Sequence, residues 1–498
     1  MISLWRALGV ILLAGNVQAA LDIVPGATWT ATNTGEHIQA HGAENGIYYM
    51  IGEEKSNGSA FQAVNCYSSV DLIEWSFERR LLSRTEERGD LGPNRVIERP
   101  KVIKNDKTGL YVMWLHVDSS DYKDARVGVA TSDSICGEYE YHESFRPLGF
   151  QSRDIGLFKD EDESAYLLTE DREYGTRIIK LTDDYLDVTE VTFGWEYFAE
   201  SPALVKHQDT YFIFGSHLTG WNPNDNVYSY AKSLKGPWSE WTEFAPVGSL
   251  THRSQVNYVQ PLSTDKVIYM GDRWEPNNLG ASTYIWLPLK FDGNDVTLDW
   301  YDRWTVDITA GDWYNSVDVT EQEGEDGELS NESIVINCSR CSGSKAAGYL
   351  GGDDDGTVTF NVDVESDGRV TLVFKYLNGD YNSRFAAVLV NGQEQNCAFL
   401  STAHYSTGVG SSIAHVNLIG GVNTIIVSGS TGWGPDIDQL LTPKDTQAII
   451  SITRSLNAAA DSKFGGSTQI VVERFAPTAV PLMVEHTSAI KVFYYAAI

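Results

Sequence analysis

One short pattern recurs five times between residues 39 and 274 and restricts the folds that this chain can adopt. Each copy has a strand-like stretch, a polar turn, a second strand of aromatic and apolar residues, and a third strand-like run. The second strands begin at Tyr48, Tyr111, Tyr166, Tyr211 and Val267. Repeats of this length, each a small antiparallel sheet, are typical of propeller blades. The sequence therefore predicts an all-β fold that begins with a five-bladed β-propeller; one large β-sandwich is the alternative.

Polar residues occupy matching positions in four of the repeats. Glu98 stands 13 residues before the start of its second strand, Asp154 stands 12 before, Glu200 stands 11 before, and Gln255 stands 12 before. The innermost strands of a propeller begin on one face of its central channel. We therefore expect three carboxyl groups and one amide to face each other in a single funnel.

A cluster of carboxyl groups suits the hydrolysis of glycosidic bonds. One acid protonates the leaving oxygen, and in inverting enzymes a base about 6.5–9.5 Å away activates a water molecule. Carboxyl groups that lie close together raise the pKa of at least one of them, which keeps an acid protonated near neutral pH. The alternatives are that these acids are ordinary loop residues or that they bind a metal.

The composition narrows the classes of partner. The formal net charge is −31, and such a surface repels nucleic acid and anionic membranes. Its 14 Trp and 25 Tyr residues offer faces for stacking on sugars, although aromatic residues also fill β-sheet cores. We expect a monomeric protein that acts on a neutral or weakly charged polysaccharide.

The first 19 residues read as a secretory signal peptide. Arg6 supplies a positive charge, residues 7–14 are apolar but too few to span a bilayer, and small residues at Val17 and Ala19 suit cleavage. Asn-x-Ser sequons begin at Asn57, Asn331 and Asn337. We expect a secreted, extracellular protein, with no later membrane span.

The five cysteines fall into two groups. Cys66 and Cys136 lie in the first half and could form a disulfide, whereas Cys338, Cys341 and Cys397 lie in the second half, so one of these three stays unpaired or bonds elsewhere. A zinc site at the Cys338–Cys341 pair would lack further ligands. In an oxidising compartment a disulfide to Cys397 is the favoured expectation.

Six short stretches of the first half carry a resemblance to a known family. They are Ile38–Ala43, Gly52–Ser56, Val96–Val102, Ser152–Asp154, Ser216–Trp221 and Tyr269–Trp274. They resemble glycoside hydrolase family 43, and more narrowly its fungal exo-β-1,3-galactanases. With the second module included, the resemblance covers roughly residues 22 to 441.

This resemblance implies roles for the aligned residues. Glu200 would be the general acid, Asp154 would tune it, and Glu98 would contact the reacting sugar and its water. The galactose pocket would also include three residues from other positions: Glu53, Tyr122 and Trp221.

The usual base of the family is missing. Most members of family 43 carry a base Asp on the first blade, but Gln39-Ala40-His41 stands there in this chain. The galactanase-like members share this absence, and Gln255 occupies the position of their proposed substitute. A neutral amide is a very weak base, so Gln255 would act as its imidic-acid tautomer or would orient a water that Glu98 deprotonates.

Residues 317–442 have a different composition, which is rich in Gly, Ser, Val and Asp and includes runs of alternating apolar and polar residues. This pattern predicts a β-sandwich (jelly-roll) module. This part resembles carbohydrate-binding module family 35. The resemblance assigns Glu321, Glu323 and Asp438 to a structural Ca²⁺, whose hard oxygen ligands these would be. It assigns contact with the sugar to Tyr349, Arg384 and Asp436. The alternative to the ion is a solvated acidic edge without metal.

Together these features predict a signal peptide (1–19), a catalytic propeller (20–310), the sandwich (317–442) and a tail (443–498) that matches nothing. The expected activity is that of an inverting exo-β-1,3-galactanase that releases galactose from arabinogalactan-type chains and needs no cofactor for catalysis. The alternatives are an α-L-arabinofuranosidase or β-xylosidase of the same fold, and a non-catalytic, lectin-like propeller.

Overall fold

The computed structural model describes residues 21–39, 47–316, 318–405, 408–430 and 432–444. The expected signal peptide, His41 and nearly all of the tail lie outside the described residues. The described chain is built from strands, with a single four-residue turn α1 (Leu250–Arg253). The four 3₁₀ turns are η1 (Pro147–Gly149), η2 (Leu279–Ala281), η3 (Gly324–Asp326) and η4 (Ser342–Ser344). None of the described helices has the length and apolar character that crossing a bilayer requires.

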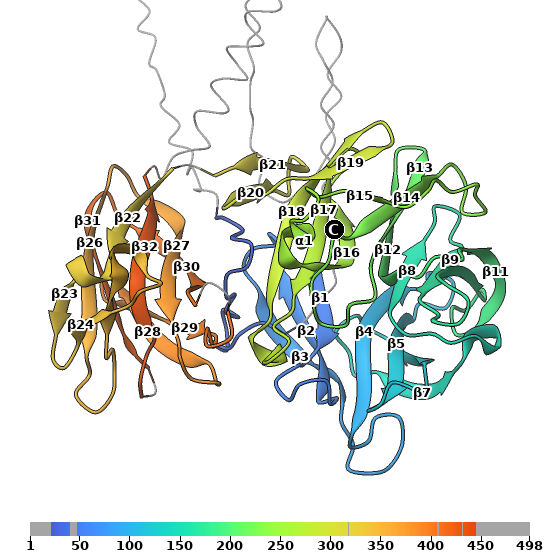
Figure 1. The fold of residues 1–498 in the computed structure, drawn as a ribbon, viewed down its shortest axis with the longest axis horizontal. Helices are drawn as coiled ribbons and strands as arrows, with labels where there is room; N and C mark the ends of the chain where they lie inside the picture. The colour runs from blue at the N-terminus through green and yellow to red at the C-terminus, as the bar shows by residue number, and fades with distance from the viewer. Residues whose placement is uncertain (1–20, 40–46, 317, 406–407, 431, 445–498) are drawn as a thin grey trace, which may run out of the picture. The chain divides into compact units, whose positions relative to one another are not determined.

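The first half folds into five successive antiparallel sheets, which follow one another along the chain from blue to yellow-green in Figure 1. The first sheet has β1 (Tyr48–Glu53), β2 (Ala63–Ser69) and β3 (Ser76–Ser83). The second has β4 (Arg95–Lys104), β5 (Tyr111–Ser119), β6 (Arg126–Ser132) and β7 (Glu140–Phe145). The third has β8 (Ile155–Lys159), β9 (Ala165–Thr169), β10 (Arg177–Leu181) and β11 (Val188–Gly194).

The fourth and fifth sheets repeat the order of four consecutive antiparallel strands. The fourth has β12 (Glu200–His207), β13 (Thr210–Ser216), β14 (Val227–Ala231) and β15 (Thr242–Glu243). The fifth has β16 (Gln255–Pro261), β17 (Val267–Arg273), β18 (Thr283–Asp292) and β19 (Asp295–Leu298). The predicted second strands are all present as β1, β5, β9, β13 and β17.

Large side chains that the repeat pattern placed in the second strands fill the space between sheets. Trp114 on β5, Phe212 on β13 and Tyr269 on β17 are completely buried. Aromatic and β-branched residues suit such a pleated surface with both faces covered. The recurring pattern therefore reflects the core of each sheet.

The first strands of the second to fifth sheets lie side by side, in the order β4, β8, β12 and β16, and β1, the predicted second strand of the first repeat, contacts β4. Asp154 immediately precedes β8, and Glu200 and Gln255 are the first residues of β12 and β16. Glu98 lies within β4, where the pairing with β5 shifts register after this residue. The predicted alignment of these four residues at strand starts is thus confirmed for three, and Glu98 reaches the same level through an irregularity in its strand.

Two of these strands have the same backbone irregularity directly after an acidic residue. Arg99 follows Glu98 with φ +51°, and Ser201 follows Glu200 with φ +58°. Each is the residue before a proline, and the pairing of each strand shifts register at this point. A left-handed residue beside an interruption of the ladder is the geometry of a β-bulge, which redirects the preceding side chain.

The second half forms two sheets that face each other across a shared core containing Phe360, Phe374 and Ile425. One contains β22 (Val319–Glu323), β24 (Ile334–Asn337), β25 (Lys345–Gly348), β27 (Gly368–Leu377), β30 (Gly410–Leu418) and β32 (Asp436–Pro443). The other contains β23 (Glu328–Ser330), β26 (Thr357–Val364), β28 (Arg384–Val390), β29 (Gln393–Phe399) and β31 (Gly421–Gly429). The hairpin of β20 (Trp304–Asp307) and β21 (Asp312–Asn315) precedes them. The predicted β-sandwich is therefore confirmed.

The cysteines pair only partly as expected. Cys66 and Cys136 form a disulfide, as the sequence allowed. In the second half the predicted bond to Cys397 is wrong, because Cys338 bonds to Cys341 instead. Cys397 points into the sandwich core from β29, whereas the other two lie on the turn after β24 with their Cα atoms 5.4 Å apart, within disulfide range.

Candidate active site

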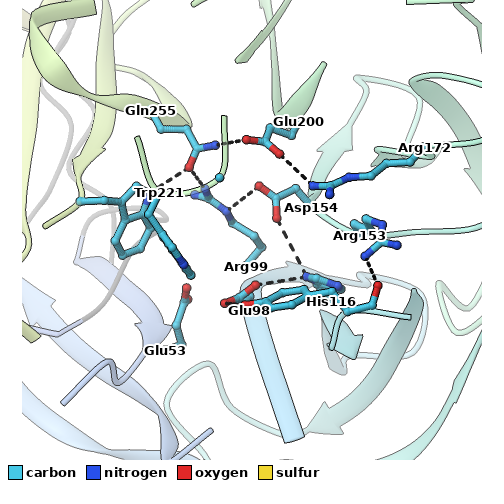
Figure 2. A pocket seen from close by; sticks show the side chains of 13 residues that line it. Glu53, Glu98, Arg99, His116, Arg153, Asp154, Arg172, Glu200, Trp221 and Gln255 are labelled. Carbon is cyan, nitrogen blue, oxygen red and sulfur yellow. Dashed lines mark hydrogen bonds and ion pairs between the residues drawn. The ribbon is translucent and has the colours of Figure 1, made fainter. Parts of the chain in front are cut away.

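A pocket of about 210 Å³ opens where the first strands of the sheets begin. It is lined by Glu53, Glu98, Arg99, His116, Tyr122, Arg153, Asp154, Arg172, Glu200, Gly220, Trp221, Gln255 and Trp274. Figure 2 shows the four aligned residues converging from different sheets. The four residues that the repeats placed in the funnel, and the three that the resemblance assigned to the galactose pocket, all line this one pocket. Its volume is below the usual range for ligand sites, about 300–1,000 Å³, and suits a small ligand such as one sugar ring.

Glu98 is held as a carboxylate on the pocket floor. Its Oε1 accepts hydrogen bonds from Lys55 Nζ at 2.8 Å and from the Tyr122 hydroxyl at 3.0 Å. Its Oε2 lies 3.5 Å from Nδ1 of His116. Burial alone would raise the pKa of Glu98, but Lys55 and His116 outweigh it and hold that pKa below its ordinary value.

His116 is a buried cation that the sequence reasoning missed. Its Nε2 lies 3.0 Å from Asp118 Oδ2, and its Nδ1 faces Glu98. Burial would lower the pKa of His116, but hydrogen bonds to Asp118 and Glu98 raise it to about 9. The sequence contains one sign of this buried histidine, because His116 interrupts the apolar strand β5 two residues after Trp114.

Glu98, His116 and Asp154 each offer a ligand atom, and these atoms lie within 4.8 Å of one another. The trio does not suit a metal, because both ring nitrogens of His116 already face carboxylates and its raised pKa keeps both protonated. An imidazolium has no free lone pair to donate. The trio is therefore best described as a buried ion-pair cluster.

Glu200 lines the same pocket and has two acidic neighbours, Asp154 and Glu170. Burial, followed by the charges of Asp154 and Glu170, raises its pKa to about 8, although Arg172 and Arg99 oppose this rise. Its Oε1 accepts a hydrogen bond from Gln255 Nε2 at 3.2 Å, and its Oε2 accepts one from Arg172 at 3.2 Å. At neutral pH this carboxyl group therefore carries a proton that it can donate.

Gln255 uses both atoms of its amide. Its oxygen accepts hydrogen bonds from Arg99 Nη2 and from Trp274 Nε1, the latter at 2.9 Å. Its nitrogen donates to Glu200 and to Ser216 Oγ at 2.9 Å. Guanidinium and indole N–H groups can only donate, so this orientation of the amide is the one that satisfies every partner.

The turn before Gln255 has an unusual backbone. Leu250 to Arg253 all have positive φ, between +50° and +60°, so that α1 is a short left-handed turn without glycine. Asp225 holds its start by accepting from Leu250 N at 2.7 Å, and Ser254 Oγ donates to Thr251 O at 2.6 Å. Left-handed non-glycine residues cost about 1 kcal/mol or more each and persist only where the surroundings determine them. This turn sets the direction in which β16 begins.

Arg99 joins the two sides of the pocket. Its Nε donates to Asp154 Oδ2 at 3.2 Å and its Nη1 to Asp272 Oδ2 at 3.1 Å, while Nη2 reaches Gln255. Arg99, Asp272 and Gln255 are all buried. The guanidinium therefore neutralises two carboxylates and fixes the amide at once.

Aromatic and polar residues form the remaining wall. The rings of Trp221 and Trp274 lie 4.8 Å apart at a steep angle, and Lys55 Nζ lies 5.0 Å from the Trp221 ring. Glu53 is buried beside Lys55 at 3.8 Å. A half-buried tryptophan with nearby charged hydrogen-bonding groups is a fitting platform for a sugar ring. Gln39 stands behind this wall, where its Oε1 accepts from Lys55 N.

The sandwich brings the three predicted sugar-binding residues together. Arg384 and the backbone N–H of Tyr349 both lower the pKa of Asp436, which burial raises overall. Tyr349 is half exposed, and Trp433, which the sequence reasoning missed, stands edge-on to it at 5.9 Å and is similarly exposed. Two exposed aromatic rings beside a charged pair form a surface on which a sugar could stack.

The predicted calcium ligands are only partly brought together. Glu323 and Asp438 meet at Ser342, which donates its hydroxyl to Glu323 and its N–H to Asp438, each at 2.9 Å. Glu321 is exposed and reaches only Gln439 at 3.5 Å. Burial followed by Glu323 and Glu325 raises the pKa of Asp438 to about 6.

Glu325, which the sequence reasoning missed, faces the same cluster. Its Oε2 and that of Glu323 are buried without a hydrogen-bond partner among the described residues. Buried carboxylate oxygens without partners are costly unless a cation satisfies them. Glu323, Glu325 and Asp438 therefore offer oxygen atoms of the kind that a hard cation such as Ca²⁺ prefers, whereas Glu321 lies on the exposed side.

Comparison with known proteins agrees with this geometry. The family model for glycosyl hydrolases family 43 matches residues 38–261, and the model for carbohydrate binding module family 35 matches residues 320–441. An exo-β-1,3-galactanase from Phanerochaete chrysosporium, solved with galactose, is 39% identical over 84% of this chain and 99% of its own, with a TM-score of 0.60. The chain belongs to glycoside hydrolase family 43.

Other solved structures extend the comparison. A family 43 β-1,3-galactosidase solved with galactodeoxynojirimycin is 33% identical, over 57% of this chain and 100% of its own, with a TM-score of 0.53. An exo-β-1,3-galactanase from Clostridium thermocellum shares the fold at 24% identity, over 84% of this chain and 99% of its own, with a TM-score of 0.55. A search of curated proteins found no match. This family 43 chain is thus a glycosidase with a propeller fold, followed by a carbohydrate-binding β-sandwich.

Proposed function

We propose that this family 43 glycosidase is a secreted exo-β-1,3-galactanase that releases galactose from the main chain of β-1,3-galactan or arabinogalactan. The observation that carries the proposal is that Glu200 and Glu98 line one small pocket, where the pKa of Glu200 is raised to about 8 and that of Glu98 is held below its ordinary value. Two carboxyl groups with opposite protonation states are what glycoside hydrolysis needs. The galactan specificity is supported by the substrates in the names of the relatives.

In the proposed reaction Glu200 donates its proton to the glycosidic oxygen as the bond to the anomeric carbon breaks. Water attacks the opposite face and inverts the configuration at that carbon. Asp154 keeps a negative charge near Glu200, which helps to hold the proton on Glu200 before the reaction. Glu53, Tyr122 and Trp221 hold the galactosyl ring through the hydroxyl groups and the apolar face of the sugar.

The water's proton passes to Glu98. This carboxylate is a weak base because Lys55 and His116 stabilise its charge, but attack on an oxocarbenium-like centre makes the water strongly acidic as the new bond forms. The imidic-acid form of Gln255 would place an O–H against two obligate donors, Arg99 and Trp274. Gln255 therefore acts as an amide that holds Glu200 and Arg99 in place.

The finer features of the fold belong to the same proposal. The five sheets are the blades of one closed propeller within residues 20–310, and residues 317–442 form the binding module. Closure is supported by contacts between the segment before β1 and the region of β18 and η2, such as Tyr284 donating to Ile38 O at 2.6 Å and Gln39 donating to Gly280 O at 3.2 Å. In the binding module Tyr349, Arg384 and Asp436 contact the polysaccharide, and Ca²⁺ stabilises the acidic cluster without a part in catalysis.

Secretion and a monomeric state complete the proposal. They rest on the signal-like residues 1–19 and on the high negative charge. Sequencing the N-terminus of protein recovered from a culture medium tests the expected start near Ala20, and light scattering tests the monomer.

The deciding experiment is incubation with β-1,3-galactan and, in parallel, with arabinoxylan, followed by chromatography of the products. Galactose from galactan as the first product supports the proposal. Arabinose or xylose would indicate an arabinofuranosidase or xylosidase, and binding without any product would indicate a lectin. Proton NMR of the first galactose released tests inversion, because α-galactose is expected and β-galactose would exclude the inverting course.

A further inference from the structure

Arg172 lies at the edge of the pocket, on the turn between β9 and β10, and no role has been assigned to it so far. Its Nη2 donates to Glu200 Oε2 at 3.2 Å, and its Nε donates to Glu170 Oε1 at 2.8 Å. We propose that Arg172, anchored on the buried carboxylate of Glu170, is the positioning residue that orients Glu200 and balances its charge once the proton has left. This inference rests on the proposed role of Glu200 as the general acid.

The anchor of Arg172 is built into the third sheet. Glu170 is completely buried and directly follows β9, and its backbone N–H donates to Asp154 O at 3.0 Å. Its Oε2 has no hydrogen-bond partner among the described residues. Burial raises the pKa of Glu170, and Arg172 opposes that rise more than any other group. A buried carboxylate with one strong partner is a fixed point from which a guanidinium can be aimed.

The turn that carries Arg172 is also well determined. Asp171, completely buried, accepts from Glu173 N at 2.7 Å and from Tyr174 N at 3.3 Å. The side chain of Arg172 is 46% exposed, in contrast to its carboxylate partners. It therefore lies at the border between the buried acids and the mouth of the pocket, as Figure 2 shows.

Four charged groups act on Glu200 from the elements around it: Asp154 and Glu170 from the third sheet, Arg172 from the same sheet, and Arg99 from β4. Arg99 is already committed to Asp154, Asp272 and Gln255. Arg172 is the cation that contacts Glu200 directly, through the oxygen that Gln255 does not hold. Gln255 and Arg172 thus hold the two oxygens separately.

This arrangement has a consequence for the proton. While Glu200 is protonated, Arg172 remains paired with Glu170, so its charge is compensated. When Glu200 gives its proton to the leaving oxygen, a new negative charge appears beside Arg172, and the guanidinium stabilises it without moving far. Without Arg172, Glu200 holds its proton more tightly and becomes a weaker donor.

The test compares pH profiles of kcat and kcat/KM on β-1,3-galactobiose for the wild type, Arg172→Gln, Arg172→Lys and Glu170→Gln. Loss of the cation raises the pKa of Glu200, so Arg172→Gln moves the alkaline limb of kcat/KM upward by about 0.5 to 1 pH unit, a range that allows for solvent screening. It lowers kcat by about tenfold and leaves KM within about twofold. Glu170→Gln removes a negative neighbour and moves the limb downward.

Arg172→Lys keeps the charge but cannot bridge both acids, so it restores the position of the limb and recovers only part of kcat. Melting temperatures of the three variants close to that of the wild type show that they fold. The inference is overturned if the alkaline limb of kcat/KM in Arg172→Gln coincides with that of the wild type. It is also overturned if the limb moves in the same direction in Arg172→Gln and Glu170→Gln. A rise in KM alone assigns Arg172 to substrate binding and overturns it as well.

The proposed function has its own readout in the same experiment. Glu200→Gln that retains normal turnover refutes the general acid, whatever the Arg172 variants do. An inactive Glu200→Gln together with unmoved limbs in the Arg172 variants refutes only the positioning role.

Discussion

Gln255 donates its amide Nε2 to Oε1 of Glu200 at 3.2 Å, so the candidate base and the candidate acid are bonded directly to each other. In an inverting glycosidase the two groups stand about 6.5–9.5 Å apart, because a sugar carbon and a water must fit between them. The bond leaves no such space between Gln255 and Glu200. The proton acceptor must lie elsewhere in the pocket, and our candidate is Glu98, whose pKa is held below its ordinary value and whose side chain lines that pocket.

Chemical rescue distinguishes these two residues. We expect Glu98→Gly to lose turnover by about 10²–10⁴-fold, the usual contribution of a proton-transfer group, and to recover part of it in azide, which replaces the activated water as a nucleophile. Gln255→Gly is expected to lose activity without recovery in azide, since its role is to hold Glu200. Initial rates and the anomer of any galactosyl azide provide the measurement. Rescue confined to Gln255→Gly would assign the base to Gln255.

The pKa of Glu200 predicts how activity depends on pH. Because this carboxyl group must be protonated to act, and burial with neighbouring acids raises its pKa to about 8, kcat/KM should stay high through neutral pH and fall tenfold per unit above about pH 8. An Asp154→Asn variant removes one of the negative neighbours and should move this fall to lower pH. A fall that begins near pH 5 in the wild type would show that Glu200 is ionised at neutral pH.

The buried charge of His116 predicts how stability depends on pH. Its pKa is raised to about 9 in the folded protein, against about 6.5 in an unfolded chain. The resulting stabilisation is complete below pH 6.5 and is lost as pH rises through 9, by about 1 to 3 kcal/mol. Glu200, whose pKa is also raised, adds to the same trend. Denaturant unfolding of the wild type and His116→Gln between pH 6 and 9 measures the difference, and equal slopes would contradict the assignment.

The acidic cluster of the sandwich predicts a response to calcium. We expect EDTA to lower the melting temperature of the sandwich by several degrees and Ca²⁺ to restore it, because the ion satisfies buried oxygens of Glu323 and Glu325. Glu325→Gln should abolish this response, whereas Glu321→Gln, on the exposed side, should preserve it. Calorimetry with and without chelator is the measurement. Loss of the response in Glu321→Gln alone would restore the ligand set expected from the resemblance.

The thiol of Cys397 predicts a simple labelling result. Burial raises its pKa to about 12, and its side chain is completely enclosed, so it should resist alkylation in the native protein. After unfolding without reductant, one thiol should react, and peptide mass spectrometry should find Cys338 linked to Cys341. A linked peptide that contains Cys397 would show that the sequence expectation was correct after all.

Much of the catalytic half could be predicted from its repeats. Recurring runs of aromatic and apolar residues identified β5, β9, β13 and the other second strands, because such strands are buried on both faces. The alignment of Glu98, Asp154 and Glu200 followed from that register. A repeated tripeptide, Glu-x-Pro at Glu98 and at Glu200, is a further sign that the two positions are equivalent.

The groups that set the charge of the site were harder to predict. The effects of His116 and Arg172 on the carboxyl groups depend on their distances and burial, which the sequence of a single strand does not show. Nothing in the spacing of Arg172 indicates that it reaches Glu200 on another sheet. The same holds for Glu325 and Cys397 in the sandwich. Their surroundings depend on which side of η3 and of β29 faces the core, and only the packed structure shows this.

The bulges after Glu98 and Glu200 separate the placement of the reactive carboxyl groups from the shape of the pocket wall around them. Main-chain geometry, set by Arg99 and Ser201 and the prolines after them, places the reactive carboxyl groups. The wall around them can then vary in shape without displacing the acids. A library that randomises Trp221 could search for new sugar preferences while the proton-transfer geometry stays intact, which makes this scaffold a practical starting point for engineered glycosidases.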